Sequence, residues 1–449
     1  MKLWDKGLPN NKRIESFTVG RDREFDTWMA EYDVLGSIAH IQMLEEIKLL
    51  TPTELHDLKH QLIQIFYDIQ AGNFVIEDNV EDVHSQVEVL LTKSLGDSGK
   101  KIHSGRSRND QVLLDIKLYI RAQIEMVSQK AGKLFKTMLL LSEQYKNVLM
   151  PGYTHFQVAM PSSFGLWLSS FAESLTDDLY LLHASYRITN QNPLGSAAGY
   201  GSSFPLNRQL TTDLLGFDNM NYNSIYAQMG RGKVEKTVAF ALSGFASTLN
   251  KMAMDITMYI NQNYGFFTFP SEFTTGSSIM PHKKNPDVFE LIRAKCNQII
   301  ALPNEIALIT TNLPAGYHRD LQIIKEHFFP AFDLMMDCFD LADLLLQNII
   351  VKENILDDSK YLYLFSVEEV NKLVLTGMPF RDAYKKVGMD IEQGKFKPTT
   401  DINHTHEGSI GNLCLDKIEM KWNDTLAMFN FEKTHAAYQN LLKLNRSID

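Results

Sequence analysis

Apolar residues recur at spacings of three and four over a long stretch in the first half of the chain. The stripe consists of Leu113, Ile116, Ile120, Ile124, Val127, Ala131, Leu134, Met138 and Leu141. This spacing marks one face of an α-helix and predicts a helix roughly 44 Å long at ~1.5 Å per residue. Because proline breaks helix interiors and none occurs between Pro52 and Pro151, nothing interrupts it.

A second stripe lies in the middle of the chain. It consists of Val234, Val238, Leu242, Phe245, Leu249, Met252, Ile256 and Tyr259. Its other faces carry small residues such as Ala239, Ala241 and Gly244, so the predicted helix is apolar or small nearly all round. Such a helix is buried on every side, which a bundle shared between subunits achieves more readily than one chain. Strand-like alternation is sparse, so the predicted fold class is mainly α.

The length of the chain indicates several domains. A chain of 449 residues is too long for one hydrophobic core, which stops growing near ~250–300 residues. The long helical pattern begins near residue 110, and Asp357-Asp-Ser-Lys360 interrupts it. We therefore expect an N-terminal helical domain over 1–110, a central domain of long helices over 111–357 and a small C-terminal helical domain over 358–449.

Charge and composition narrow the class of protein. The formal net charge of −10 argues against a general nucleic-acid binder, although a cleft can still hold local positive charge for an anionic substrate. Met1–Gly7 lacks the apolar stretch of a signal peptide, and no long charge-free apolar run suggests a membrane span. Cys296, Cys338 and Cys414 lie far apart, which favours reduced, buried thiols over a disulfide framework or zinc site. We expect a cytoplasmic protein without a membrane partner.

Three segments concentrate side chains that carry chemistry. Ser104-Gly-Arg-Ser-Arg-Asn-Asp-Gln111 places two arginines at the start of the first long helix, and helix N-termini attract anions. Pro151-Gly-Tyr-Thr-His-Phe-Gln157 sets His155 between hydroxyl and amide neighbours. Thr275-Gly-Ser-Ser-Ile-Met-Pro-His-Lys-Lys-Asn-Pro-Asp287 is a shaped loop whose hydroxyls and cations suit an anionic ligand. Taken singly, each also fits a structural role as a capped loop, a structural histidine or a solvated turn.

Together these segments resemble a known set. Gly276–Asp287 is similar to the signature loop of the fumarase/aspartase superfamily, whose members cleave C–N or C–O bonds and release fumarate. Ser107-Arg-Asn-Asp-Gln111 and Tyr153-Thr-His-Phe-Gln157 resemble the argininosuccinate lyase and δ-crystallin family within it.

The similarity extends along nearly the whole chain. It includes Asp33-Val-Leu-Gly-Ser37, the segment from Tyr317 to Lys325, and Gly377-Met-Pro-Phe-Arg-Asp-Ala383. Two places depart from the family pattern: His282 stands where glutamine is more common, and Ser196-Ala-Ala-Gly-Tyr-Gly-Ser202 differs from the usual glycine- and alanine-rich run. The sequence assigns no role to either.

The resemblance implies a three-domain lyase fold whose long central bundle is shared in a homotetramer, with each active site drawn from three subunits. It implies elimination of arginine from argininosuccinate with release of fumarate, without metal or organic cofactor. The catalytic residues that it implies are Ser277, His155, Lys283 and Glu290. The substrate contacts that it implies are Ser37, Asn109, Thr154, Asn285, Tyr317, Gln322 and Lys325.

The roles within this set follow from the same resemblance. Ser277 abstracts the proton, and His155, paired with Glu290, protonates the departing nitrogen. The opposite assignment, with His155 as the base and Ser277 as the donor, stays open. Two other functions also stay open: a superfamily lyase acting on a different succinyl adduct, and a catalytically inactive structural protein like δ-crystallin. The presence of His155, Ser277 and Lys283 together weighs against the inactive protein.

Overall fold

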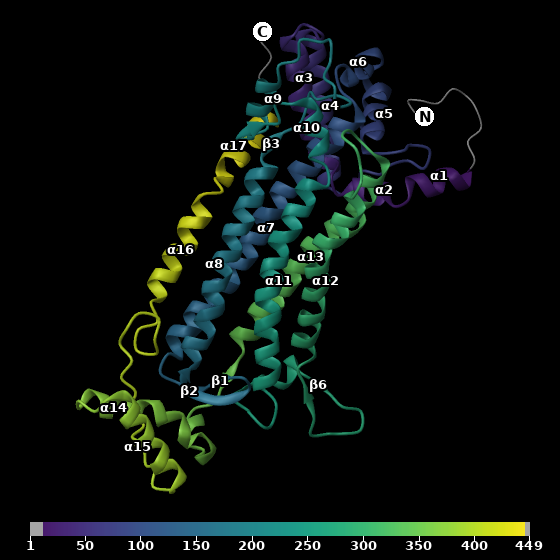
Figure 1. The fold of residues 1–449 in the computed structure, drawn as a ribbon. Coiled ribbons are helices and arrows are strands. Elements are labelled where there is room, and N and C mark those ends of the chain that lie inside the picture. Colours follow the sequence, from purple (N-terminus) through teal and green to yellow (C-terminus); the bar gives the residue numbers. More distant parts are fainter. Residues whose placement is uncertain (1–11, 445–449) are drawn as a thin grey trace.

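A bundle of long helices forms the centre of the molecule in the computed structural model, which describes residues 12–444 (Figure 1). The stretch Met1–Gly7, on which the expectation of no signal peptide rests, lies outside the described residues. The bundle consists of α7 (Arg108–Gln144), α8 (Phe164–Thr189), α11 (Lys233–Tyr259), α12 (Asp287–Thr310) and α13 (Ile324–Gln347). The mainly helical fold class that the sequence predicts is confirmed.

Both apolar stripes form the helices that they predict, and local contacts fix where these helices begin. The first stripe lies on α7, whose cap is Ser107: its hydroxyl accepts a hydrogen bond from the backbone N–H of Asn109, and its own N–H donates to the Asp110 carboxylate. The second stripe lies on α11. This helix follows Gly232, which has a positive φ of 77° and donates its N–H to Glu235 at 2.6 Å.

Two bundle helices contain a proline in their interior. Pro303 lies within α12 and Pro330 within α13. Both helices continue past the proline, although each loses one backbone hydrogen bond there. The proline-free stretches of the sequence therefore mark only some of the long helices.

Shorter helices surround the two ends of the bundle. Before α7 come α1 (Lys12–Val19), α2 (Asp22–Thr27), α3 (Ala30–Glu46), α4 (Pro52–Gln70), α5 (Val83–Leu95), α6 (Asp97–Lys100) and η1 (Lys101–His103). Between and after the bundle helices come α9 (Arg208–Leu214), α10 (Ser224–Met229), η2 (Ser271–Phe273), η3 (Arg319–Ile323), η4 (Ile355–Asp357), η5 (Ser359–Phe365), α14 (Ser366–Leu375) and α15 (Phe380–Glu392). The last helices, α16 (Leu415–Ala427) and α17 (Phe431–Leu441), run back along the outside of the bundle (Figure 1).

Strands are short and occur in pairs. The antiparallel hairpin of β1 (Leu149–Thr154) and β2 (Gln157–Ser163) is the longest pair. The others are β3 (Gln191–Asn192) with β4 (Asn219–Met220), β5 (Phe267–Thr268) with β8 (Ile350–Val351), and β6 (Thr275–Gly276) with β7 (Lys284–Asn285).

The bundle has two distinct ends (Figure 1). We call one the α3 end: it carries α2 to α6, α9, α10 and α17. We call the other the hairpin end: it carries β1, β2, β6, α14 and α15. No helix among residues 12–444 is both long and apolar enough to cross a membrane. All three cysteines are free thiols, but only Cys296 and Cys338 are buried as expected, because Cys414 lies half-buried before α16.

Candidate active-site segments

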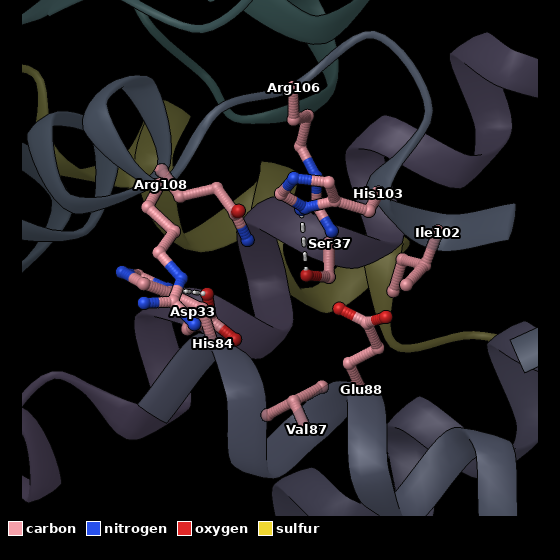
Figure 2. Close-up of a pocket in the computed structure, with 10 residues that line it drawn as sticks. Asp33, Ser37, His84, Val87, Glu88, Ile102, His103, Arg106 and Arg108 are labelled. Carbon is pink, nitrogen blue, oxygen red and sulfur yellow. Dashed lines mark hydrogen bonds and ion pairs between the residues drawn. The ribbon is translucent and has the colours of Figure 1, made fainter. Parts of the chain in front are cut away.

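Ser37 faces a small enclosed cavity at the α3 end (Figure 2). Helix α3 contributes Asp33 and Ser37, α5 contributes His84, and the segment before α7 contributes Arg106. Arg106 donates a hydrogen bond from Nη1 to the Ser37 hydroxyl at 3.0 Å. The free space is about 10 Å³, room for a single water. The hydrogen bond from Arg106 therefore fixes the Ser37 hydroxyl, and the cavity is too small for a substrate in this conformation.

A buried ion network lies beside this cavity. His84 Nδ1 is 2.7 Å from an oxygen of Asp33 and 3.5 Å from an oxygen of Asp115. Burial opposes the charged imidazole, but the attraction and hydrogen bond of Asp33, with Asp115, outweigh it and raise the pKa of His84 to about 10. The network thus contains an imidazolium bonded to Asp33, whereas burial and the neighbouring Asp33 raise the pKa of Asp115 well above its ordinary value. The charge of Arg106 also interacts with both acids.

The same three side chains are the one candidate metal-ligand group within residues 12–444. Ligand atoms of Asp33, His84 and Asp115 lie within 4.8 Å of one another. A bound cation needs a neutral histidine, and here the histidine carries a proton and a guanidinium already supplies further positive charge. We interpret the group as an ion network. The absence of a metal cofactor stays a prediction.

The Asp110 carboxylate joins two segments that the sequence could not connect. Besides the cap bond, it accepts hydrogen bonds from the backbone N–H groups of Gly195, at 3.0 Å, and Ala197, at 2.9 Å. Burial raises the pKa of Asp110 to about 6, although these backbone donors favour the charged form. The segment Ser196–Ser202, which differs from the family pattern, is therefore anchored at the start of α7, next to the half-buried Asn109.

Three further residues expected to contact the substrate lie at the α3 end: Tyr317, Gln322 and Lys325. Lys325 is buried and bonds to the carboxylates of Asp22 at 2.6 Å and Asp26 at 2.5 Å. The Gln322 amide donates to the backbone carbonyls of Thr18 and Val19, at 3.0 and 3.1 Å. These two expected substrate contacts are thus taken by the N-terminal helices α1 and α2. Tyr317 lies half-buried in the loop before η3.

At the hairpin end, His155 occupies the turn between β1 and β2. Thr154 pairs with Gln157 across the hairpin, so His155 and Phe156 are its two turn residues. Both have positive φ, 55° and 59°, the backbone of the tight turn that matches strand twist but that usually contains Asn or Gly. The His155 side chain is exposed, and non-glycine residues in this region are mildly strained and cluster at functional sites.

The loop between β6 and β7 also lies at the hairpin end and projects from the bundle (Figure 1). The Ser277 oxygen accepts backbone N–H bonds from Met280 at 3.1 Å and, more weakly, from Ile279 at 3.4 Å. Donors aimed at this oxygen stabilise negative charge on it. Lys283 is exposed in the same loop, and Asn285 bonds to Thr275 at 3.5 Å.

The expected partnership of His155 with Glu290 is not made within one chain. Glu290 lies exposed in the first turns of α12, and no hydrogen bond or ion pair between it and His155 occurs among the described residues. His282 is exposed, like the lysines that follow it.

The expected site residues therefore form two groups at opposite ends of the bundle. Asn109 is in the first turn of α7, and Thr154 comes shortly after the last turn. A helix of 37 residues is about 55 Å long, several times the length of a small metabolite. The α3 end carries α3 and the start of α7, and the hairpin end carries β1, β2 and β6 (Figure 1). One chain therefore has Ser37 and Asn109 at the first end, and Thr154, His155 and the Ser277 loop at the second.

Two parts of this arrangement were missed in the sequence. No local pattern pairs Asp33 with His84, which lie on different helices 51 positions apart. The anchoring of residues 195–197 by Asp110 is equally remote in sequence, since 85 positions separate Gly195 from Asp110. A glycine-rich run is the only signal that points to a special backbone there.

Comparisons with known proteins find similar sequences over nearly the whole chain. Residues 8–301 match a family model described as a lyase. The chain is 60% identical to the argininosuccinate lyase of Parabacteroides distasonis over 441 residues, which covers 98% of this chain and 99% of that protein. It is 61% identical to that of Bacteroides thetaiotaomicron with the same coverage.

Solved structures share the fold at low sequence identity. The crystal structure of EDDS lyase in complex with formate superposes with a TM-score of 0.77 at 21% identity, covering 97% of this chain and 95% of that chain. A fumarate lyase:delta crystallin from Brucella melitensis, in its native form, gives 0.68 at 16% identity, covering 85% and 93%. At these identities the likeness concerns the fold alone.

Proposed function

From the premise that this chain belongs to the argininosuccinate lyase family, we propose how it carries out the reaction of that family. The chain is a carbon–nitrogen lyase that eliminates arginine from argininosuccinate and releases fumarate. A proton leaves the carbon next to a carboxylate, and the guanidinium nitrogen leaves the adjacent carbon. Because that carboxylate is already negative, the developing charge needs cations and hydrogen-bond donors aimed at it.

The Ser277 loop supplies such groups in our proposal. Ser277 abstracts the proton, supported by the backbone N–H groups of Ile279 and Met280 that point at its oxygen. Lys283 and Asn285 stabilise the new charge on the carboxylate. His155 protonates the departing nitrogen, with the carboxylate of Glu290 orienting its ring. The reverse assignment of Ser277 and His155 stays open, because neither side chain meets a reacting atom in one chain.

The α3 end binds the substrate in this proposal. Ser37 and Asn109 contact it beside the start of α7, and Thr154 contacts it from the hairpin end of another chain. The substrate is also contacted by Tyr317, Gln322 and Lys325. Gln322 and Lys325 can do so only after their bonds to residues 18–26 have broken. The buried ion pairs of Lys325 with Asp22 and Asp26 support this sequence of bond breaking and substrate binding. While the Lys325 amine is bonded to both carboxylates, it cannot bind a carboxylate of the substrate.

The separation of the two groups of site residues is the observation that supports a composite active site, formed by residues of more than one chain. A homotetramer in which neighbouring bundles run antiparallel can bring hairpin-end segments of two other chains to the α3 end of one chain, so that three subunits form each site. The bundle has an apolar surface for this contact: Phe240 and Met254 on α11 are 52% and 43% exposed, and Leu291 and Leu308 on α12 are 60% and 68% exposed. Exposed apolar surface of this kind is typical of subunit contacts.

Mixing inactive variants tests this composite site. Asn109→Ala removes a residue of the α3 end, and Ser277→Ala removes one of the hairpin end. After the two are dissociated and reassembled together, up to about a quarter of the parent activity should return, since some sites receive both intact ends. Two variants of the same end, Asn109→Ala and Ser37→Ala, serve as the control and should not rescue each other. Without recovery in the first mixture, the composite site is wrong.

The remaining sequence predictions form part of the same proposal. The division into 1–110, 111–357 and 358–449 is supported near α14 and α15 by a separate apolar core of Val370, Ala383, Val387 and Phe396, whereas α16 and α17 rejoin the bundle. The absence of a nucleic-acid partner and a cytoplasmic location also stay predictions.

A further inference from the structure

A second cavity lies at the α3 end, on the opposite face of α3 from Ser37. Asp33 and Ser37 line the small cavity of Figure 2, whereas Glu31, Tyr32 and Leu35 line the second one. Helices α7 and α17 contribute further lining residues, among them Arg121 and Tyr438. It has about 220 Å³ of free space, enough for a molecule the size of an amino acid. We call it the α17 cavity.

The α17 cavity contains a buried cation without an acidic partner. Arg121 is 2% exposed, and all its hydrogen-bond partners are neutral: the carbonyls of Leu215 and Gly216, at 3.1 and 3.3 Å, and the hydroxyl of Thr434. Its guanidinium lies 4.4 Å from the ring centre of Phe217. No carboxylate among residues 12–444 forms an ion pair with it, and its Nε has no partner there. A buried charge left in this way is costly unless an anion joins it.

A second unpartnered donor belongs to the same cavity. The hydroxyl of Tyr438, on α17, is buried and has no hydrogen-bond partner within the described residues. Burial raises the pKa of Tyr438, although the charge of Arg121 opposes this, so the hydroxyl keeps its proton and offers an O–H donor. The Arg121 guanidinium carbon lies 5.9 Å from the ring centre of Tyr438, so a cationic donor and a neutral donor are close together, as the two oxygens of one carboxylate require.

The rest of the lining has the opposite character. The aromatic side chains of Tyr32, Phe66, Tyr186 and Phe431 form the walls. Two carboxylates complete it: Glu31, which is half-buried, and Glu125, which accepts a bond from His435 at 2.9 Å. Aromatic faces beside carboxylates favour a cationic or amphipathic group. The α17 cavity therefore combines a place for an anion with a place for a cation.

We propose that the α17 cavity binds a free α-amino acid, whose carboxylate accepts hydrogen bonds from Arg121 Nε and Tyr438 Oη while its ammonium group faces Glu31. Its side chain lies among the aromatic walls, and a guanidinium there also faces Glu125. L-arginine, which the reaction releases, has all these groups. Since α3 lies between the two cavities, an occupant beside Tyr32 acts on the same helix that carries Asp33 and Ser37, so the site suits an effector.

Calorimetric titration of the intact enzyme with L-arginine tests this site. We expect two binding events per chain, one at the active site and one in the α17 cavity. In Tyr438→Phe the second event should weaken about tenfold, the effect of removing one hydrogen bond to a charged group, while activity without added arginine stays unchanged. Tyr186→Phe removes a hydroxyl from the same cavity that the ligand does not use, and it should bind like the parent.

Agmatine separates the carboxylate contact from the others, because it is arginine without that group. It should fail to give the second event. A single binding event per chain in the parent, or titrations of Tyr438→Phe that superimpose on the parent, would overturn the proposal. Equal binding of agmatine in the α17 cavity would do so too, since it would show that Arg121 and Tyr438 do not receive a carboxylate.

Discussion

At the α3 end, Lys325 and His84 are buried among carboxylates, whereas at the hairpin end His155 and Lys283 are exposed. The first group is held by bonds within the chain that persist without substrate. The second group has its backbone fixed, by the turn at His155 and the β6–β7 pairing, but the side chains of His155 and Lys283 have no hydrogen-bond or ion-pair partner among residues 12–444 of the same chain. In our proposal, one chain therefore contains a binding half whose polar side chains are already bonded within the chain, and a catalytic half whose His155 and Lys283 are exposed.

This comparison predicts that substitutions at the two ends differ in kind. Changes to the exposed side chains of His155 and Lys283 at the hairpin end should affect the chemical step and leave stability alone, because these side chains are not packed. Changes at the α3 end should affect stability first. The predictions below test that separation, beginning with the largest expected effect.

Lys283→Met should lower kcat by about 10²–10³, because the lost charge acts mainly in the transition state. Its melting temperature should stay that of the parent, since the side chain is exposed. Steady-state kinetics and a thermal melt measure the two effects. Lys284→Met is the matched control in the same loop: this amine bonds to Ser271, and its loss should cost less than about tenfold. A normal kcat with a raised KM for Lys283→Met would show instead that Lys283 only anchors substrate.

Asp33→Ala should destabilise the protein by about 3–5 kcal/mol, because it removes the carboxylate that bonds to buried His84 at 2.7 Å. Denaturant titration at one fixed protein concentration measures the change, since assembly contributes to stability. Asp57→Ala is the matched control: Asp57 also pairs with a histidine, His56, but on the surface, and its loss should have no measurable effect. Equal effects of the two substitutions would show that burial does not set the contribution of the Asp33–His84 pair to stability.

The pH dependence of stability should reveal His84 directly. Its pKa is about 10 in the folded protein, above the ordinary value of 6.5, so its stabilising contribution is complete below about pH 6.5 and is lost as the pH rises toward 10. The melting temperature should therefore fall between pH 7 and 10, by on the order of 3–5 °C from this group. His84→Gln should melt lower at pH 7 and show a flatter profile over the same range. Parallel profiles for the two proteins would contradict a charged His84.

His282→Gln should change kcat/KM by less than about twofold at every pH tested, because the side chain is exposed. It restores the residue more common in the family at this position. The measurement is the pH profile of kcat/KM for the parent and the variant. A displaced acid limb in the variant would give His282 a part in closing the loop over an anion.

Much of the fold follows from the sequence because helix periodicity is local. The stripes of Leu113–Leu141 and Val234–Tyr259 each lie on one helix, and their ends are set by neighbours in sequence, such as the bond from Ser107 to Asp110. The helices that contain Pro303 and Pro330 are harder to predict, since tertiary packing maintains them despite a local breaker.

The positions of the candidate site residues are harder to predict from local sequence patterns. The resemblance names the residues, but their distribution over the two ends depends on the length of α7 and on the course of the chain after it. The contacts of Asp110 with Gly195 and of His84 with Asp33 bridge distant segments, and no periodicity encodes them. The segment Ser196–Ser202, whose role the sequence left open, proves to be anchored beside Asn109.

The return of α17 to the α3 end has a consequence for how this protein is made. The hydroxyl of Thr434 bonds to Arg121, which lies 313 positions earlier. Helices α3 and α7 leave the ribosome long before α17 exists, and until then the guanidinium lacks its contacts with Thr434 and Tyr438. Domains tend to fold in the order of synthesis, and distant contacts form slowly. The packing of α3 and α7, which are synthesised early, is therefore completed only when α17, the last helix described, docks against them.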